Sequence, residues 1–102
     1  MAEIEWTIRW TPRAYENIEQ ISLLISQNFS EKTAQDFVKE VINTIENNIK
    51  SFPYMFKKVP NLKDDTIRQA LVKKYRIIYE INKKEKIIRI VTIFHSSWML
   101  KF

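Results

Sequence analysis

The chain has 102 residues, which is enough for one domain with a single hydrophobic core and too few for two. It has no cysteine and a single histidine, which excludes disulfides, a thiol nucleophile and a cysteine-built zinc site, so we expect neither a metal nor a cofactor. The net charge of +5 is uneven: residues 1–56 carry five Lys/Arg against eight Asp/Glu, whereas residues 57–102 carry twelve against four. A basic C-terminal half suggests an anionic partner, and the alternative is a solvated surface that keeps a small protein soluble.

The hydropathy pattern favours a protein of the cytoplasm with no membrane contact. No apolar run approaches the roughly 18 residues of a membrane span. Residues 1–5 are acidic and alternate in polarity, which does not fit a secretory signal. We therefore expect a cytoplasmic location.

Residues 3–10 alternate between polar and apolar side chains, which predicts a half-buried strand. Thr11 and Pro12 then supply an N-cap and a proline at the first helical position, where the missing N–H costs nothing. Apolar residues at spacings of three and four follow. They predict a first helix that ends near residues 27–28.

A second helix is expected after Ser30, which is a favourable N-cap residue. Its apolar stripe is long and regular and contains Ala34, Phe37, Val38, Val41, Ile45 and Ile49. Pro53 stops this helix, and residues 53–65 lack periodicity, so we expect a surface loop there. The short link between the helices predicts an antiparallel helical hairpin.

Three strands are predicted next, over residues 66–72, 75–82 and 86–94. Residues 73–74 and 82–85 form the turns between them. Because the chain has no glycine, we expect the tight turns to rely on asparagine or on longer loops.

The order of elements is typical of one α+β domain covering residues 1–102, with the helical hairpin on one face of the sheet. We expect the last three strands to be antiparallel. The first strand must join them to bury Trp6 and Trp10, and its expected neighbour is the last strand, in parallel. Tyr75 and Tyr79 share their parity with isoleucines of the same strand, so we interpret them as core residues; stacking on nucleic-acid bases is the alternative.

Short motifs follow one another in a fixed order along nearly the whole chain. They are Trp10-Thr11-Pro12 with Ala14, Ala34 with Phe37, Phe52-Pro53, Val59-Pro60-Asn61-Leu62, Ile67-Arg68, Leu71-Val72, Tyr75-Arg76-Ile77-Ile78-Tyr79 and Phe94-His95-Ser96-Ser97. This ordered set resembles the RelE/ParE superfamily of bacterial type II toxin–antitoxin toxins, including its plasmid-stabilisation members. The Tyr-Arg-aliphatic-aliphatic-Tyr strand after an Ile-Arg strand is the strongest part of the resemblance.

The resemblance implies the toxin fold of that superfamily and one of two activities. RelE-like members cut messenger RNA in the ribosomal decoding site, and ParE-like members bind and poison DNA gyrase without chemistry. In both branches a cognate antitoxin wraps and neutralises the toxin, and the complex commonly represses its own operon. Operator DNA would then be contacted only through the antitoxin.

Arg76 and Arg68 occupy strand positions where apolar residues would be expected. In the nuclease branch of the family the arginine after tyrosine contacts the scissile phosphate, so the resemblance gives Arg76 a catalytic role in stabilising charge on phosphate oxygens. The alternative is a structural ion pair with Glu80 or Asp65. Arg68 matches the Ile-Arg position of ParE-like members, and its parity predicts that both arginines project from one sheet face.

Four lysines are close to these arginines in the sequence. Lys57 and Lys58 precede Arg68 in the loop, and Lys73 and Lys74 form the turn that follows it. Together with the two arginines they could form a patch that contacts nucleic acid or the cellular target. Taken one by one, each lysine is better explained as ordinary protein surface.

His95 closes the last predicted strand and is the one side chain whose unperturbed pKa lies near neutrality. The resemblance implies a role as general acid or base, because some nuclease members use a histidine or tyrosine near this end. Such catalysis needs a second group, and the sequence offers only Glu46 and Glu80 as candidates. The alternative is a histidine that is hydrogen-bonded at the end of the sheet.

Trp98 departs from the family pattern, because many relatives carry arginine shortly after the histidine. One hypothesis is an inactivating change, which would leave an attenuated member that only binds its antitoxin. An aromatic tail could also dock on the core or into an antitoxin groove. The Ile-Arg pattern, the proline-containing loop and the missing acid–base pair together favour the ParE-like activity over RelE-like cleavage.

Overall fold

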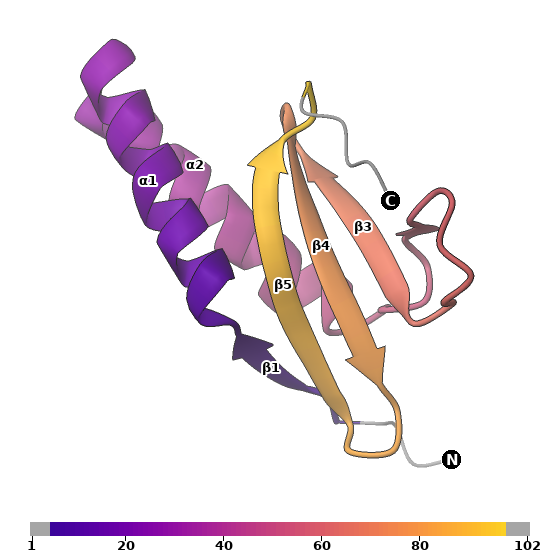
Figure 1. Cartoon of the computed structure of the whole chain (residues 1–102). Coiled ribbons are helices and arrows are strands. Elements are labelled where there is room, and N and C mark those ends of the chain that lie inside the picture. The colour runs from indigo at the N-terminus through magenta and orange to yellow at the C-terminus, as the bar shows by residue number, and fades with distance from the viewer. Residues whose placement is uncertain (1–4, 98–102) are drawn as a thin grey trace.

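The computed structural model describes residues 5–97, and two helices cover one face of its five-stranded sheet (Figure 1). The strand order is β1-β5-β4-β3-β2. In chain order the elements are β1 (Thr7–Trp10), α1 (Pro12–Asn28), α2 (Glu31–Asn43), η1 (Thr44–Ile49), β2 (Lys57–Lys58), β3 (Ile67–Val72), β4 (Tyr75–Asn82) and β5 (Ile87–His95). The predicted α+β class and single sheet are confirmed.

Both helices begin at the predicted caps. The Thr11 hydroxyl accepts the N–H of Ala14 at 3.1 Å, and the Ser30 hydroxyl accepts the N–H of Thr33 at 3.0 Å. The predicted second helix is divided, because α2 ends at Asn43 and the chain continues as the π-helix η1. The apolar stripe crosses this boundary without a break, so the sequence pattern does not mark it.

The sheet has the predicted connections and one additional strand. β1 pairs in parallel with β5, with Thr7 opposite Ile87, and β3, β4 and β5 are antiparallel neighbours. The expectation of a plain loop over residues 53–65 is wrong in one respect, because Lys57 and Lys58 form β2 against β3. A strand of two residues is too short to show the alternation from which strands are predicted.

The start of α1 protects the edge of β5 beyond the end of β1. The Thr11 hydroxyl donates to the carbonyl of Ile90 or of Val91, at 2.8 and 2.9 Å, and the N–H of Ile93 donates to Oδ1 of Asn17 at 3.0 Å. These bonds satisfy edge groups that would otherwise be free to pair with another chain.

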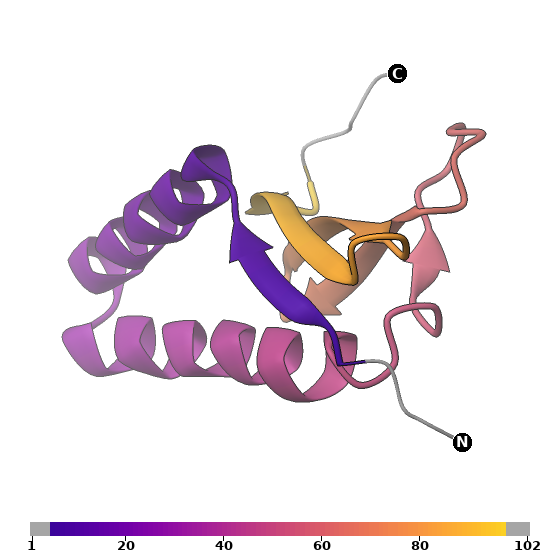
Figure 2. The same cartoon turned by 90° about the horizontal axis from the view of Figure 1, so that it is seen from below.

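Figure 2 shows the helices and the sheet from below as two layers, and residues from both layers form the main core. Phe37 is 2% exposed and its ring centroid lies 4.9 Å from that of Tyr75. Tyr79 is fully buried, and Trp6 and Trp10 pack into or against the same core. The prediction that the two tyrosines and two tryptophans serve the core is confirmed. A smaller cluster on the other side of the sheet joins Val59, Ile78 and Phe94.

The turns of this glycine-free chain use lysine as well as asparagine at left-handed positions. Asn61 has φ 68°, as expected for an asparagine turn, but Lys73 has φ 54° and Lys86 has φ 59°. The expectation that tight turns rely on asparagine or on longer loops is therefore only partly right. A residue with a Cβ is disfavoured in this region, so these two lysines lower the stability of the fold.

Replacing Lys86 by glycine should raise the free energy of unfolding by about 0.5–1 kcal/mol, because glycine adopts positive φ without steric cost. Urea unfolding measures the change. Lys84→Gly is the matched control in the same turn, where φ is not positive. We expect a small loss there, because glycine adds conformational entropy only to the unfolded chain. Equal shifts in both variants would contradict this account.

Candidate functional site

The sheet register places Arg68 and Arg76 on opposite faces. Arg68 lies opposite Tyr79, which faces the helices, whereas Arg76 lies opposite Leu71. The face turned away from the helices, here named the outer face, carries Gln69, Leu71, Arg76, Ile78 and Phe94. The prediction of one shared face is wrong, because a two-residue turn pairs odd with even residue numbers, so equal parity in β3 and β4 means opposite faces.

Arg68 is hydrogen-bonded to the segment that follows η1, at residues 54–56. Its Nη1 donates to the carbonyls of Tyr54 and Phe56 at 2.9 and 3.0 Å, and its Nε donates to the carbonyl of Asp65 at 2.8 Å. The guanidinium also lies over the Tyr54 ring, 5.4 Å from its centroid. Nearby, the buried Tyr79 hydroxyl donates to the carbonyl of Pro53 at 2.6 Å. Burial raises the pKa of Tyr79 above its ordinary value of 10.0, with Arg68 opposing the rise, so this hydroxyl remains a donor at physiological pH.

We expect Arg68→Ala to lower the free energy of unfolding by about 2 kcal/mol, because three hydrogen bonds from a charged donor to backbone carbonyls are lost. Chemical unfolding of the purified variant measures this change. Arg89→Ala is the control, because Arg89 forms a partly exposed pair with Glu80 at 2.8 Å and its loss should cost less than about 1 kcal/mol. Equal losses would contradict the anchoring role of Arg68.

Arg76 lies on the outer face of β4, the central strand of the sheet, close to the turn that joins β3 and β4, and it is incompletely paired. Its Nη1 donates to Oε1 of Gln69 at 2.9 Å, while its buried Nε has no hydrogen-bond partner among residues 5–97. The expected alternative, an ion pair with Glu80 or Asp65, is wrong, because Glu80 binds Arg89 and Asp65 binds Lys58. An unsatisfied donor of a permanent cation is costly, and such costs are typical of functional positions.

Two of the predicted contact lysines are held by carboxylates. Lys58 Nζ lies 2.9 Å from Oδ1 of Asp65, and Lys73 Nζ lies 3.8 Å from Oε2 of Glu40. All four side chains are largely exposed, so these pairs contribute little to stability. The pairs nevertheless reduce the positive charge that either lysine offers to an anionic partner.

The other two predicted contact lysines, Lys57 and Lys74, are exposed, and only Lys57 lies on the same sheet face as Arg76. Lys57 is opposite Gln69 in the sheet and therefore belongs to the outer face. Lys74 is in the turn between β3 and β4. The structure thus brings Lys57 and Arg76 to one face and places Arg68 on the other.

His95 ends β5 on the side of the sheet opposite to Arg76. It lies opposite Tyr75, whose ring it meets edge-on at 5.1 Å between centroids, whereas Arg76 lies opposite Phe94. The Nδ1 atom of His95 accepts the N–H of Ser97 at 3.1 Å. A histidine bonded at the end of the sheet was the alternative interpretation, and this geometry fits it. Trp98 lies outside the described residues.

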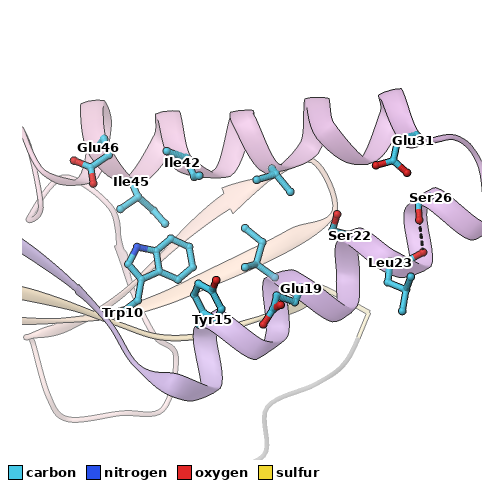
Figure 3. Close-up of a pocket in the computed structure, with 12 residues that line it drawn as sticks. Trp10, Tyr15, Glu19, Ser22, Leu23, Ser26, Glu31, Ile42, Ile45 and Glu46 are labelled. Carbon is cyan, nitrogen blue, oxygen red and sulfur yellow. Dashed lines mark hydrogen bonds between the residues drawn. The ribbon is translucent and has the colours of Figure 1, made fainter.

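A second feature is an apolar groove of about 890 Å³ between α1 and α2 (Figure 3). Trp10 and Ile45 lie at one end, and Leu23 lies toward the other. The large apolar side chains of Tyr15, Leu23 and Ile42 are exposed around it, at 60, 57 and 46%. Sequence reasoning missed this groove. The available signal was the presence of apolar residues outside the buried stripes of the two helices.

Residues 5–97 offer no group of three or more His, Cys, Asp or Glu side chains placed to hold a metal ion. Within the same residues, neither helix combines the length and the apolarity needed to cross a bilayer.

The fold is that of toxins from type II toxin–antitoxin systems. A chain of the chromosomal ParDE system from P. aeruginosa superimposes with a TM-score of 0.74 at 13% identity, covering 91% of this chain and 98% of that one. The RelBE2 toxin–antitoxin complex of Mycobacterium tuberculosis gives 0.65 at 15%, covering 92 and 94%, and the RelE–RelB complex of Pyrococcus horikoshii OT3 gives 0.52 at 14%, covering 93 and 99%. At sequence identities this low, the structural similarity shows a shared fold and nothing further.

The family follows from the sequence itself. The family model described as the ParE toxin of the type II toxin–antitoxin system ParDE matches residues 8–98. This chain therefore belongs to the ParE toxin family. A search of curated protein sequences gives no significant match.

Proposed function

We propose that this chain is a ParE-like toxin that inhibits DNA gyrase by binding it, in the cytoplasm. The observation that carries the proposal is the separation of Arg76 and His95 onto opposite faces of the sheet. Cleavage of RNA by its 2′-hydroxyl needs a cation and an acid–base group at the same phosphate. A target that is only bound needs no such pair. The outer face, which carries Arg76, is the proposed target contact.

We further propose that an antitoxin encoded beside this chain neutralises it. The structures that share its fold come from ParDE and RelBE toxin–antitoxin systems. The groove between α1 and α2 is the proposed antitoxin contact, because it offers exposed apolar side chains on a surface separate from the outer face. Operator DNA would be reached only through the antitoxin.

RelE-like cleavage of messenger RNA on the ribosome is the second candidate. One observation favours it: the Nε atom of Arg76 is unpaired within residues 5–97, and a guanidinium with a free donor suits a phosphate oxygen. Lys57 on the same face would add to the attraction for a phosphate backbone.

Purified protein should inhibit the supercoiling of relaxed plasmid by DNA gyrase and leave transcripts on translating ribosomes intact. Cleavage of those transcripts without any effect on supercoiling would overturn the proposal in favour of the second candidate. Inactivity in both assays, with tight antitoxin binding, would identify an attenuated member. A parallel assay of Trp98→Arg then tests whether Trp98 is the inactivating change, because only the arginine variant would be active.

A further inference from the structure

The groove between α1 and α2 has walls that suit a helix better than a strand. Its sides are the helices themselves, whose backbone groups are already bonded within each helix. An extended segment buried there would leave its own N–H and C=O groups unpaired, whereas a helix satisfies them internally. The exposed Tyr15, Leu23 and Ile42 then offer apolar contact to one face of such a helix.

The charges around the groove all have the same sign. Glu19, Glu31 and Glu46 line it, and no lysine, arginine or histidine does. They come from both walls and from different points along the groove (Figure 3). Ser22 and Ser26 add uncharged hydroxyl groups to the lining.

These carboxylates are weakly neutralised by the protein itself. Glu46 has only a loose contact with Lys50, at 4.0 Å, and Glu19 and Glu31 form no ion pair within residues 5–97. Glu31 also stabilises the first turn of α2, so its presence has a second explanation. Glu19 lies beyond the first turn of α1, and Glu46 lies in the first turn of η1, which continues α2 without a free helix start. These two carboxylates therefore carry the argument.

We propose that the antitoxin segment in this groove is an amphipathic helix whose apolar stripe is flanked by lysine or arginine, selected by Glu19 and Glu46. The inference rests on the proposed function for the existence of an antitoxin, and on the groove for its chemistry. The positive charge of the chain lies mainly in residues 57–102, so the acidic groove is where a basic segment is attracted rather than repelled.

Two synthetic helical peptides test this inference. Both are stapled, about 14 residues long so that they span most of α1, and share one leucine stripe; one has lysine flanks and the other has glutamate flanks. Fluorescence anisotropy should show that the lysine peptide binds this protein about tenfold more tightly, with a preference that weakens as salt is raised. Equal affinities, a preference for glutamate, or no binding of either peptide would overturn the inference.

Matched variants separate recognition in the groove from general attraction. Glu19→Gln with Glu46→Gln should abolish the preference, whereas Glu16→Gln with Asp36→Asn, which removes the same charge outside the groove, should retain it. A preference that survives the first pair would overturn the inference. So would a dimer in solution that Ile42→Asp dissociates, because a second copy would then fill the groove.

The outcome is independent of the gyrase assay. Inhibition of gyrase without any peptide preference rejects the inference and leaves the proposed function standing. A lysine preference without gyrase inhibition supports the inference and rejects gyrase as the target.

Discussion

Replacing Arg76 by methionine is expected to raise the half-inhibitory concentration in the supercoiling assay by about 30-fold or more, while leaving the fold intact. The size of the loss follows from the partly buried position of Arg76 on the outer face, since a well-packed arginine of a binding surface typically contributes about 2 kcal/mol or more. Stability should change by less than about 0.5 kcal/mol, because the loss of the hydrogen bond to Gln69 is offset by removal of a buried donor that has no partner within residues 5–97.

Methionine is chosen because its unbranched side chain replaces the aliphatic part of Arg76, which lies beside Leu71 and Phe94, and removes only the guanidinium group. Arg89→Met is the matched control on the same face, where the guanidinium is already paired with Glu80. We expect less than a fivefold change there. Unaltered inhibition by a folded Arg76→Met protein would remove the outer face from the target contact.

Truncation of Phe37 to alanine is expected to lower the free energy of unfolding by about 3–5 kcal/mol. The side chain is 2% exposed, packs against the Tyr75 ring and belongs to the cluster that joins α2 to the sheet. Removing the ring leaves a cavity between two layers that cannot close without moving α2. Since a domain of this size is stable by about 5–15 kcal/mol, the loss is a large fraction of its total stability.

The same substitution at Phe29 provides the control. Phe29 is 78% exposed at the end of α1, so Phe29→Ala should change the free energy of unfolding by less than about 0.5 kcal/mol. Urea titrations of both variants followed by circular dichroism give the comparison directly. Similar losses at both positions would mean that the helical layer is packed differently from the arrangement described above.

The elements with local signals could be predicted from the sequence. The starts of both helices were predicted from Thr11-Pro12 and Ser30, because a capping residue bonds only to groups within the first turn of its own helix. The alternation of polar and apolar residues predicted the long strands. The need to bury Trp10 predicted that β1 joins the sheet beside β5. By contrast, β2 was missed, because its two lysines pair with β3 only through tertiary structure.

The candidate site was less predictable, because it depends on register and on packing between distant segments. The residues Arg68 and Arg76 were singled out correctly as unusual, but their faces depend on the length of the turn between the strands. The anchoring bonds of Arg68 reach carbonyls up to 14 residues away in the chain. The groove requires two helices and Trp10 to meet, which no local pattern encodes.

The parallel pairing of the first and last strands has a consequence for synthesis of the protein on the ribosome. β1 cannot form its sheet hydrogen bonds until β5 is synthesised, because Thr7 pairs with Ile87, 80 positions later in the chain. Until β5 emerges, β4 also lacks its neighbour, and the strand that carries Arg76 remains an unprotected edge. A nascent chain that still lacks β5 therefore exposes this edge to proteases and to other chains, and β1 can join the sheet only once β5 has been made.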